Sequence, residues 1–158
     1  MTKDTKVVVK VLTIVAIIAI VSGLVLVGCD KLKDAGKPDA EEGAKSVTIL
    51  LQNGNGYSSY TAKTSAEYVQ DLLVELKNAG VFAYEFHNTE YGAFMDVLGT
   101  MHPNSDNYEY IMFYHDINDA ELIYPGYDVE YDGKTYSSAS LGVSSFPVRD
   151  GATYLFKV

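Results

Sequence analysis

The C-terminal part of this chain contains one stretch whose apolar residues recur at helical spacing, residues 66–76. Apolar side chains there stand three or four residues apart, and Gly80 follows as a helix-ending residue. Thr64 and Glu67 stand at its start with the spacing of a capping box. The sequence therefore predicts one helix in this part of the chain, and the other elements are expected to be strands.

Short segments rich in β-branched and aromatic residues surround this helix. Phe82, Tyr84 and Phe86, for example, alternate with other residues, as expected for a strand with one buried face. The Asn-Gly-Asn-Gly sequence at 53–56 is typical of a hairpin turn. The expected strands cover residues 46–53, 57–62, 81–86, 91–98, 108–115, 127–131, 135–140 and 152–158.

The order of these elements is strand, strand, helix, strand and then a run of further strands. This order predicts the α+β class, with a mainly antiparallel β-sheet and one covering helix. The arrangement is expected to be β-grasp-like. Residues 46–158 are numerous enough to bury their own core without disulfides.

Four features of this domain carry a family resemblance. They are the spacing of the helix after the first hairpin, the strand that starts at Tyr91 and ends at Leu98-Gly99, the aromatic strand YIMFY at 110–114, and the closing segment GVSSFPVRDGATYLF at 142–156. Together they resemble a bacterial family similar to the C-terminal domain of transcobalamin and intrinsic factor, a domain of unknown function, over residues 46–158. The family usually has Trp where this chain has Ile111. A longer connecting segment also replaces the short turn that follows the aromatic strand in the family. The resemblance implies the fold, and it suggests cobalamin-like ligands.

Residues 1–28 have the organisation of an export signal. Three lysines within the first ten residues precede an uncharged run from Val11 to Val27. The sequence LVGC at 26–29 resembles the lipobox of bacterial lipoproteins, which implies cleavage before Cys29 and a lipid on its thiol. An uncleaved single-span anchor is the alternative. Either reading places the rest of the chain at the bacterial cell membrane, facing outside the cytoplasm.

Residues 29–45 are expected to be the lipidated cysteine and a flexible tether. From residue 30 to residue 45 there are four lysines and five acids, and no aromatic or β-branched residue. Such a segment buries too little apolar surface to become ordered alone. The expected organisation is a signal peptide at 1–28, the tether at 29–45 and the domain at 46–158.

Charge is distributed unevenly along the chain, whose formal net charge is −9. Between Lys77 and Lys134 there is no Lys or Arg, but there are eleven acids, all three histidines and eight of the thirteen tyrosines. This balance opposes binding to nucleic acid. An acidic, tyrosine-rich surface suits cationic or amphipathic ligands. The alternative is a solvated acidic surface that keeps an exported protein soluble.

Five tyrosines in and after the aromatic strand are the candidate ligand-binding residues, since they offer aromatic faces and hydroxyl groups. The expected function is a non-catalytic ligand-binding module at the cell surface, for cobalamin-like or other small molecules. The alternative is an adhesion or interaction module that binds a protein or a glycan through exposed tyrosines. The candidates are Tyr108, Tyr110, Tyr114, Tyr124 and Tyr127.

Metal and catalytic patterns are weak. Residues 116–121 are rich in oxygen ligands but lack the glycine and the final glutamate of an EF-hand loop, so only a loose calcium site stays open. No serine lies in a nucleophile elbow, and Cys29 is assigned to the lipid. We therefore expect no enzyme activity, no cofactor and no zinc centre. The histidines, which lack zinc-site spacing, are His87, His102 and His115.

Overall fold

The computed structural model describes residues 36–90 and 92–158. Residues Pro38–Val158 form one compact unit with its own core. The expected export signal and Cys29 lie outside the described residues. Within the described part of the chain, no helix is long and apolar enough to span a membrane. The elements are β1 (Lys45–Asn53), β2 (Gly56–Thr64), α2 (Val69–Asn78), β3 (Tyr84–Thr89), β4 (Gly92–Leu98), the 3-10 turn η1 (Ser105–Asn107), β5 (Met112–His115), β6 (Ile123–Tyr131), β7 (Lys134–Ala139) and β8 (Thr153–Lys157).

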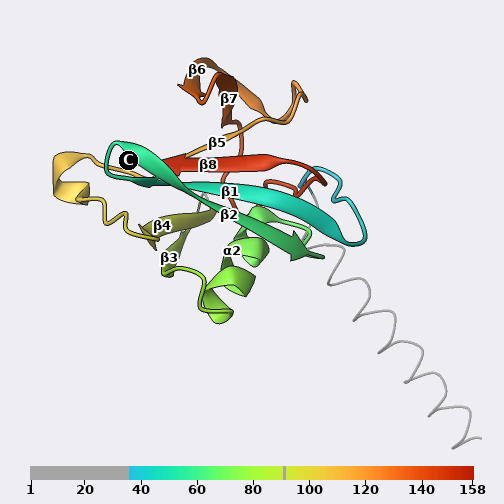
Figure 1. The fold of residues 1–158 in the computed structure, drawn as a ribbon, viewed down its shortest axis with the longest axis horizontal. Helices are drawn as coiled ribbons and strands as arrows, with labels where there is room; N and C mark the ends of the chain where they lie inside the picture. Colours follow the sequence, from blue (N-terminus) through green and yellow to red (C-terminus); the bar gives the residue numbers. More distant parts are fainter. Residues whose placement is uncertain (1–35, 91) are drawn as a thin grey trace, which may run out of the picture. The chain divides into compact units, whose positions relative to one another are not determined.

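Six strands form a mixed sheet in the order β2-β1-β8-β5-β7-β6, and β3 and β4 form a separate hairpin (Figure 1). The central strands β1 and β8 run parallel, and the other strand pairs are antiparallel. For the described residues, the predicted α+β class with one α-helix and a mainly antiparallel sheet is confirmed. The parallel pairing of the first and last strands makes the sheet mixed, which the sequence did not predict.

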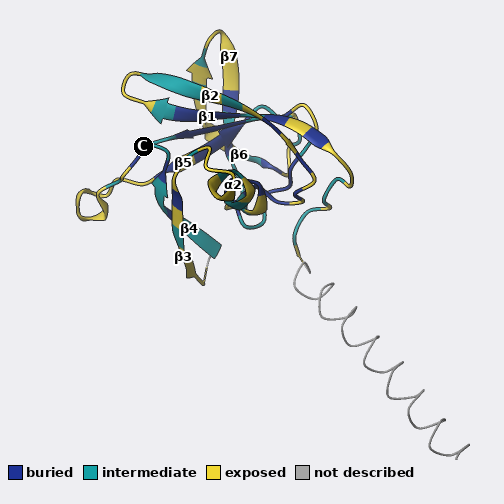
Figure 2. Ribbon diagram, turned by 60° about the horizontal axis from the view of Figure 1, so that its bottom comes forward, coloured by how far each residue is buried: buried dark blue, intermediate teal, exposed yellow. Residues whose placement is uncertain are grey.

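The main core lies between one face of the sheet and the layer formed by α2 and the β3–β4 hairpin (Figure 1). Alternation along the strands directs Ile49 of β1 and Phe156 of β8 into this core, together with Leu72 of α2. These central strands are also the most continuously buried part of the domain (Figure 2). The sheet therefore serves as the rigid base on which the loops are placed.

A smaller cluster covers the opposite face of the sheet. Leu50 and Leu155 point to this face, where they pack with Tyr114 and Tyr136. Tyr57 of β2 and Tyr131 of β6 also meet, with ring centroids 4.5 Å apart. Because β2 and β6 are the two edge strands, this contact shows that the sheet is strongly curled.

The start of α2 differs from the prediction. The helix begins at Val69, and no side chain caps it; Thr64 instead donates its hydroxyl proton to Glu75. The first backbone N–H groups of α2 donate to the carbonyls of Phe146 and Val143. The predicted capping box is therefore wrong, because backbone carbonyls of the closing segment accept the hydrogen bonds that a capping side chain would.

The end of α2 confirms the prediction for Gly80. This residue has φ +72°, which favours glycine. Its N–H donates to the carbonyl of Lys77, and the N–H of Val81 donates to the carbonyl of Leu76. The pair of bonds is a Schellman motif. It also holds Val81 in the turn, so β3 begins at Tyr84 rather than at residue 81.

Two other expected strands have different bounds. Residues 108–111 lie in the loop before β5, and Tyr108 there has the left-handed φ of 59°. β6 begins at Ile123, before the expected residue 127, and pairs with β7 on both sides of an irregularity between Tyr124 and Val129. The Pro-Gly pair within this irregularity reads as a loop in the sequence, although the strand continues through it.

The described end of the expected tether contacts the folded unit. The Asp150 N–H donates to the carboxylate of Glu41, and Lys45 donates to the backbone carbonyls of Glu41 and Gly43. Lys45 is only 2% exposed and begins β1. The residues just before β1 are therefore part of the domain surface.

Candidate ligand-binding site

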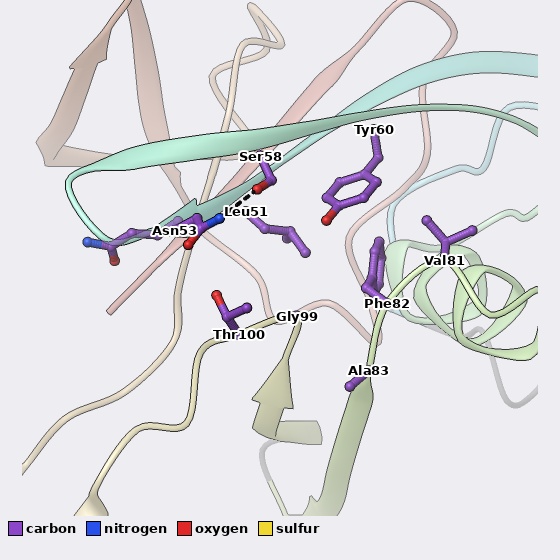
Figure 3. Close-up of a pocket in the computed structure, with 10 residues that line it drawn as sticks. Leu51, Asn53, Ser58, Tyr60, Val81, Phe82, Ala83, Gly99 and Thr100 are labelled. Atoms are coloured by element: carbon purple, nitrogen blue, oxygen red, sulfur yellow. Dashed lines mark hydrogen bonds between the residues drawn. The ribbon is translucent and has the colours of Figure 1, made fainter.

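An open pocket of about 250 Å³ lies beside the turn of the β1–β2 hairpin (Figure 3). Its other walls are the turn after α2 and the turn after β4. The pocket thus joins three segments that are far apart in the sequence. Its lining residues are Leu51, Gln52, Asn53, Ser58, Tyr60, Val81, Phe82, Ala83, Gly99 and Thr100.

A close approach between two segments shapes the pocket. Gly99 has φ +61°, and its N–H donates to the carbonyl of Ala83 over 2.8 Å. A Cβ atom at this position would lie 2.9 Å from Cδ1 of Leu51. Any larger residue at this position would force the Leu51 side chain to shift, so glycine suits the close approach of the chain after β4 to β1.

The apolar wall of the pocket contains two aromatic rings. Tyr60 of β2 and Phe82 of the turn after α2 meet edge to face, with centroids 5.3 Å apart. Both rings are half-buried and pack against the main core. Val81 and Leu51 extend this wall (Figure 3). Because the core holds both rings, their pocket faces are fixed before any ligand enters.

The polar wall comes from the hairpin and from Thr100. The side-chain amide of Asn53 donates to the hydroxyl oxygen of Ser58 over 3.2 Å. The side-chain oxygen of Gln52 accepts the N–H of Val158 over 2.7 Å. Among the described residues that line the pocket, none carries a charge.

The five candidate tyrosines lie elsewhere in the fold, and none of them lines this pocket. Tyr108 and Tyr110, in the loop before β5, are 84% and 41% exposed, and Tyr110 packs edge to face on Phe94. On β6, the rings of Tyr124 and Tyr127 are both exposed and lie 5.8 Å apart.

Tyr114 differs from the other four candidates because it is buried. Its ring packs in the small cluster on the outer face of the sheet, and burial raises the pKa of its hydroxyl. The structure therefore brings Tyr124 and Tyr127 together at the sheet edge, while Tyr114 packs in the small apolar cluster on the outer face of the sheet.

The residues of the pocket were not predicted as a site. Tyr60 and Phe82 were predicted only as members of the expected strands 57–62 and 81–86. The one sequence signal was Gly99, which directly follows an expected strand. A glycine there is compatible with a turn, but nothing in the sequence indicates which segment it approaches.

His115 has a structural place in the fold. It is fully buried, its Nε2 donates to the carbonyl of Leu122 over 2.9 Å, and its Nδ1 accepts the N–H of Ile117. Burial lowers the pKa of the ring, although the hydrogen bond to Leu122 acts in the opposite direction. The neutral imidazole ring of His115 therefore holds the segment that follows β5 in place through these two hydrogen bonds. His87 is bonded to Asp96 on the β3–β4 hairpin.

The two aspartates of the oxygen-rich segment 116–121 form hydrogen bonds within the fold. Asp116 accepts the N–H of Thr153 and forms an ion pair with Lys134. Asp119 accepts the N–H of Glu121. In the part of the chain that the structure describes, no three His, Cys, Asp or Glu residues are grouped to hold a metal ion.

No family model and no curated protein matches this chain. Its fold is similar to that of a proposed metal-binding protein from Ruminococcus gnavus ATCC 29149, with TM-score 0.51 and 14% identity over 71% of this chain and 93% of that one. It is also similar to haptocorrin in complex with Cbi, with TM-score 0.53 and 12% identity over 78% of this chain. The match spans 27% of haptocorrin.

At these identities the likeness shows the fold alone. The likeness to haptocorrin is a distant structural resemblance to transcobalamin-type domains. Membership of the bacterial family of transcobalamin-like domains stays a prediction.

Proposed function

We propose that this chain is a cell-surface lipoprotein whose domain is a non-catalytic ligand-binding module for small molecules. The pocket beside the β1–β2 hairpin carries this proposal, because it combines aromatic rings with a few neutral polar groups, as small-ligand sites do. The described lining residues include no histidine or carboxylate to act as a general base, which favours binding over catalysis.

The lipid anchor at Cys29 belongs to this proposal. The chain enters β1 at Lys45, and the pocket lies at the other end of β1, near Asn53. Nine residues of strand separate these ends by about 27 Å at about 3.4 Å per residue. A ligand would therefore enter at the end of the domain opposite the segment that leads to the anchor.

A cobalamin-like ligand is one version of the proposal. The structural similarity to haptocorrin, whose structure is a complex with Cbi, supports it. We also propose that the arrangement is β-grasp-like, which the parallel pairing of β1 with β8 suits. Drug-sized ligands fill pockets of about 300–1,000 Å³. A corrin ring would therefore lie across the pocket rim rather than inside it.

Calorimetric titration of the full chain, purified in detergent, with a corrinoid tests this version. Binding of one corrinoid per chain is expected, and a Phe82→Leu variant should bind it more weakly. The matched control is Phe86→Leu, the same change outside the pocket lining. Absence of heat with a folded protein would contradict the corrinoid version.

An interaction module is the second candidate function, and the Tyr124–Tyr127 pair favours it. These rings are 54% and 63% exposed on edge strand β6. Adjacent exposed tyrosines can contact a protein or a glycan with little loss of side-chain entropy. A double Tyr124→Ala, Tyr127→Ala variant should lose binding to purified surface proteins or glycans on an array. If the double variant binds like the parent, this function is wrong.

A further inference from the structure

The pocket lining is neutral in a domain that is otherwise strongly acidic. Between Lys77 and Lys134 the sequence contains eleven acids and no Lys or Arg, yet none of these acids lines the pocket. The formal net charge of the chain, −9, disfavours anions. A cation would find no carboxylate within the pocket to replace its water shell. The electrostatics therefore favour an uncharged ligand.

Several polar groups at the pocket have unused hydrogen-bonding capacity. The hydroxyls of Tyr60 and Thr100 bond to no other described residue, and both are directed toward the space between the walls (Figure 3). The Ser58 oxygen accepts from Asn53, which leaves its proton to donate. The side-chain oxygen of Asn53 stays free to accept. The pocket can thus both donate to and accept from a ligand that carries several hydroxyl groups.

The aromatic wall adds a second requirement. The rings of Tyr60 and Phe82 present carbon-rich surface that packs favourably on the C–H groups at the face of a saturated ring. A ligand must therefore carry an apolar face on one side and hydroxyl groups at its edge. The volume of about 250 Å³ lies below the range of drug-sized ligands and restricts the part that enters to one ring.

We propose that this pocket binds one ring of a neutral carbohydrate, with the apolar face of the sugar on Phe82 and Tyr60 and its hydroxyl groups on Asn53, Ser58 and Thr100. The proposal rests on the ligand-binding function proposed above and names its ligand class. It uses a surface that is separate from the tyrosine pair on β6. The ends of a longer glycan would extend out of the open side of the pocket.

Saturation-transfer NMR on the full chain, in a detergent without sugar groups, tests this inference. The probes are neutral hexoses and N-acetylhexosamines, with hexuronates and hexosamines as charged counterparts of the same ring size. We expect transfer to the ring C–H protons of at least one neutral sugar, with a dissociation constant on the order of 1 mM. The charged counterparts should show weaker transfer.

Three variants make the test specific to the pocket. Phe82→Leu removes the ring but keeps an apolar side chain, and should weaken sugar binding roughly tenfold, which corresponds to about 1.4 kcal/mol. Thr100→Val removes one hydroxyl group while keeping the shape of the side chain, and should also weaken sugar binding. The control, Phe86→Leu, should bind like the parent, and thermal unfolding of each variant confirms that it is folded.

Absence of transfer to every neutral sugar, or equal binding by the parent and Phe82→Leu, would overturn this inference. The outcomes for a corrinoid and for a sugar distinguish a failure of this inference from a failure of the proposed ligand-binding function. If a corrinoid binds while no sugar does, the domain is a ligand-binding module and the sugar inference is wrong. If neither binds, both are contradicted.

Discussion

Tyr84 and Tyr154 are both fully buried, but only one of them has partners for its hydroxyl. Tyr154 donates to the carbonyl of Pro147 and accepts the N–H of Arg149, so it ties the closing segment to β8. The hydroxyl of Tyr84 is buried with no hydrogen-bond partner among the described residues. Burial raises the pKa of both groups. A buried hydroxyl without a partner costs stability, whereas a bonded one contributes to it.

Substitution of each tyrosine by phenylalanine separates the two cases. Tyr154→Phe should lower the free energy of unfolding by about 1–3 kcal/mol, because the Arg149 N–H and the Pro147 carbonyl lose their partner. Tyr84→Phe should leave it unchanged or raise it. Urea unfolding of both variants measures the difference, and an equal loss in the two would show that Tyr84 has a partner.

The buried ring of His115 predicts how stability depends on pH. Burial lowers its pKa below the ordinary value of 6.5 in the folded state. The unfolded chain therefore takes up a proton first as the pH falls. Stability from the neutral ring is complete above pH 6.5 and is lost as the pH drops below it.

Unfolding free energies of the parent and of His115→Gln, measured between about pH 7 and pH 5, test this. The parent should lose stability across that window, and the variant should lose less. His102→Gln, at an exposed position, is the matched control. Parallel profiles for the parent and His115→Gln would contradict a neutral buried ring.

Asp116 titrates in a separate range. Burial pushes the pKa of its carboxyl upward, but hydrogen bonds from Lys134 and from Thr153 outweigh this effect and hold the pKa below 3.8. Its contribution to stability is therefore present above pH 3.8 and lost only as the pH falls below that value.

At the scale of elements, the sequence predicted whether a segment is a helix or a strand better than it predicted the first and last residues of that segment. The spacing of apolar residues identified α2, and Gly80 fixed its end, because both depend on residues close in the chain. The start of α2 was wrong because its partners, Val143 and Phe146, are far away in the sequence. β6 was too short in the prediction because pairing with β7 carries a strand through a Pro-Gly pair.

The turn after β4 predicts that replacing Gly99 by alanine costs more stability than replacing Gly54. Gly99 and Gly54 have nearly the same φ, 61° and 59°, but a Cβ would contact Leu51 only at Gly99. Gly54→Ala should therefore cost only about 1–2 kcal/mol, the penalty of the left-handed conformation. Gly99→Ala should cost about 1–3 kcal/mol more, because a methyl group must displace Leu51.

Thermal or urea unfolding of the two glycine variants gives this difference. Equal losses would mean that the turn at Gly99 moves away from β1 without cost. In that case the shape of the pocket would not depend on this close approach.

For the whole molecule, the sequence predicted the class of fold but not the location of the pocket. Within the described residues, the number of strands and the one α-helix, α2, follow from local patterns. The pocket requires that the β1–β2 hairpin, the turn at Phe82 and the turn at Gly99 meet, and this depends on the layer of α2, β3 and β4 under the sheet. The five candidate tyrosines were predicted as a site because they stand in the acidic stretch, and four of the five lie at the surface.

The proposed attachment to the membrane concerns the chain as a whole. Cys29→Ser should abolish incorporation of labelled fatty acid and release the protein from the membrane fraction, since Cys29 is the sole cysteine. Fractionation of cells that express the parent and the variant measures this. Retention of the variant in the membrane, without label in either protein, would support the uncleaved single-span anchor instead.

The central claim is that the domain binds a small ligand at the pocket beside the β1–β2 hairpin. Amide chemical-shift mapping of the full chain, with a corrinoid and a neutral sugar added in turn, tests it most directly. The claim predicts that the shifted amides cluster at Leu51–Ser58, at Val81–Ala83 and at Gly99–Thr100 for the ligand that binds. Shifts confined to Tyr124 and Tyr127 on β6, or no shifts with either ligand, would contradict it.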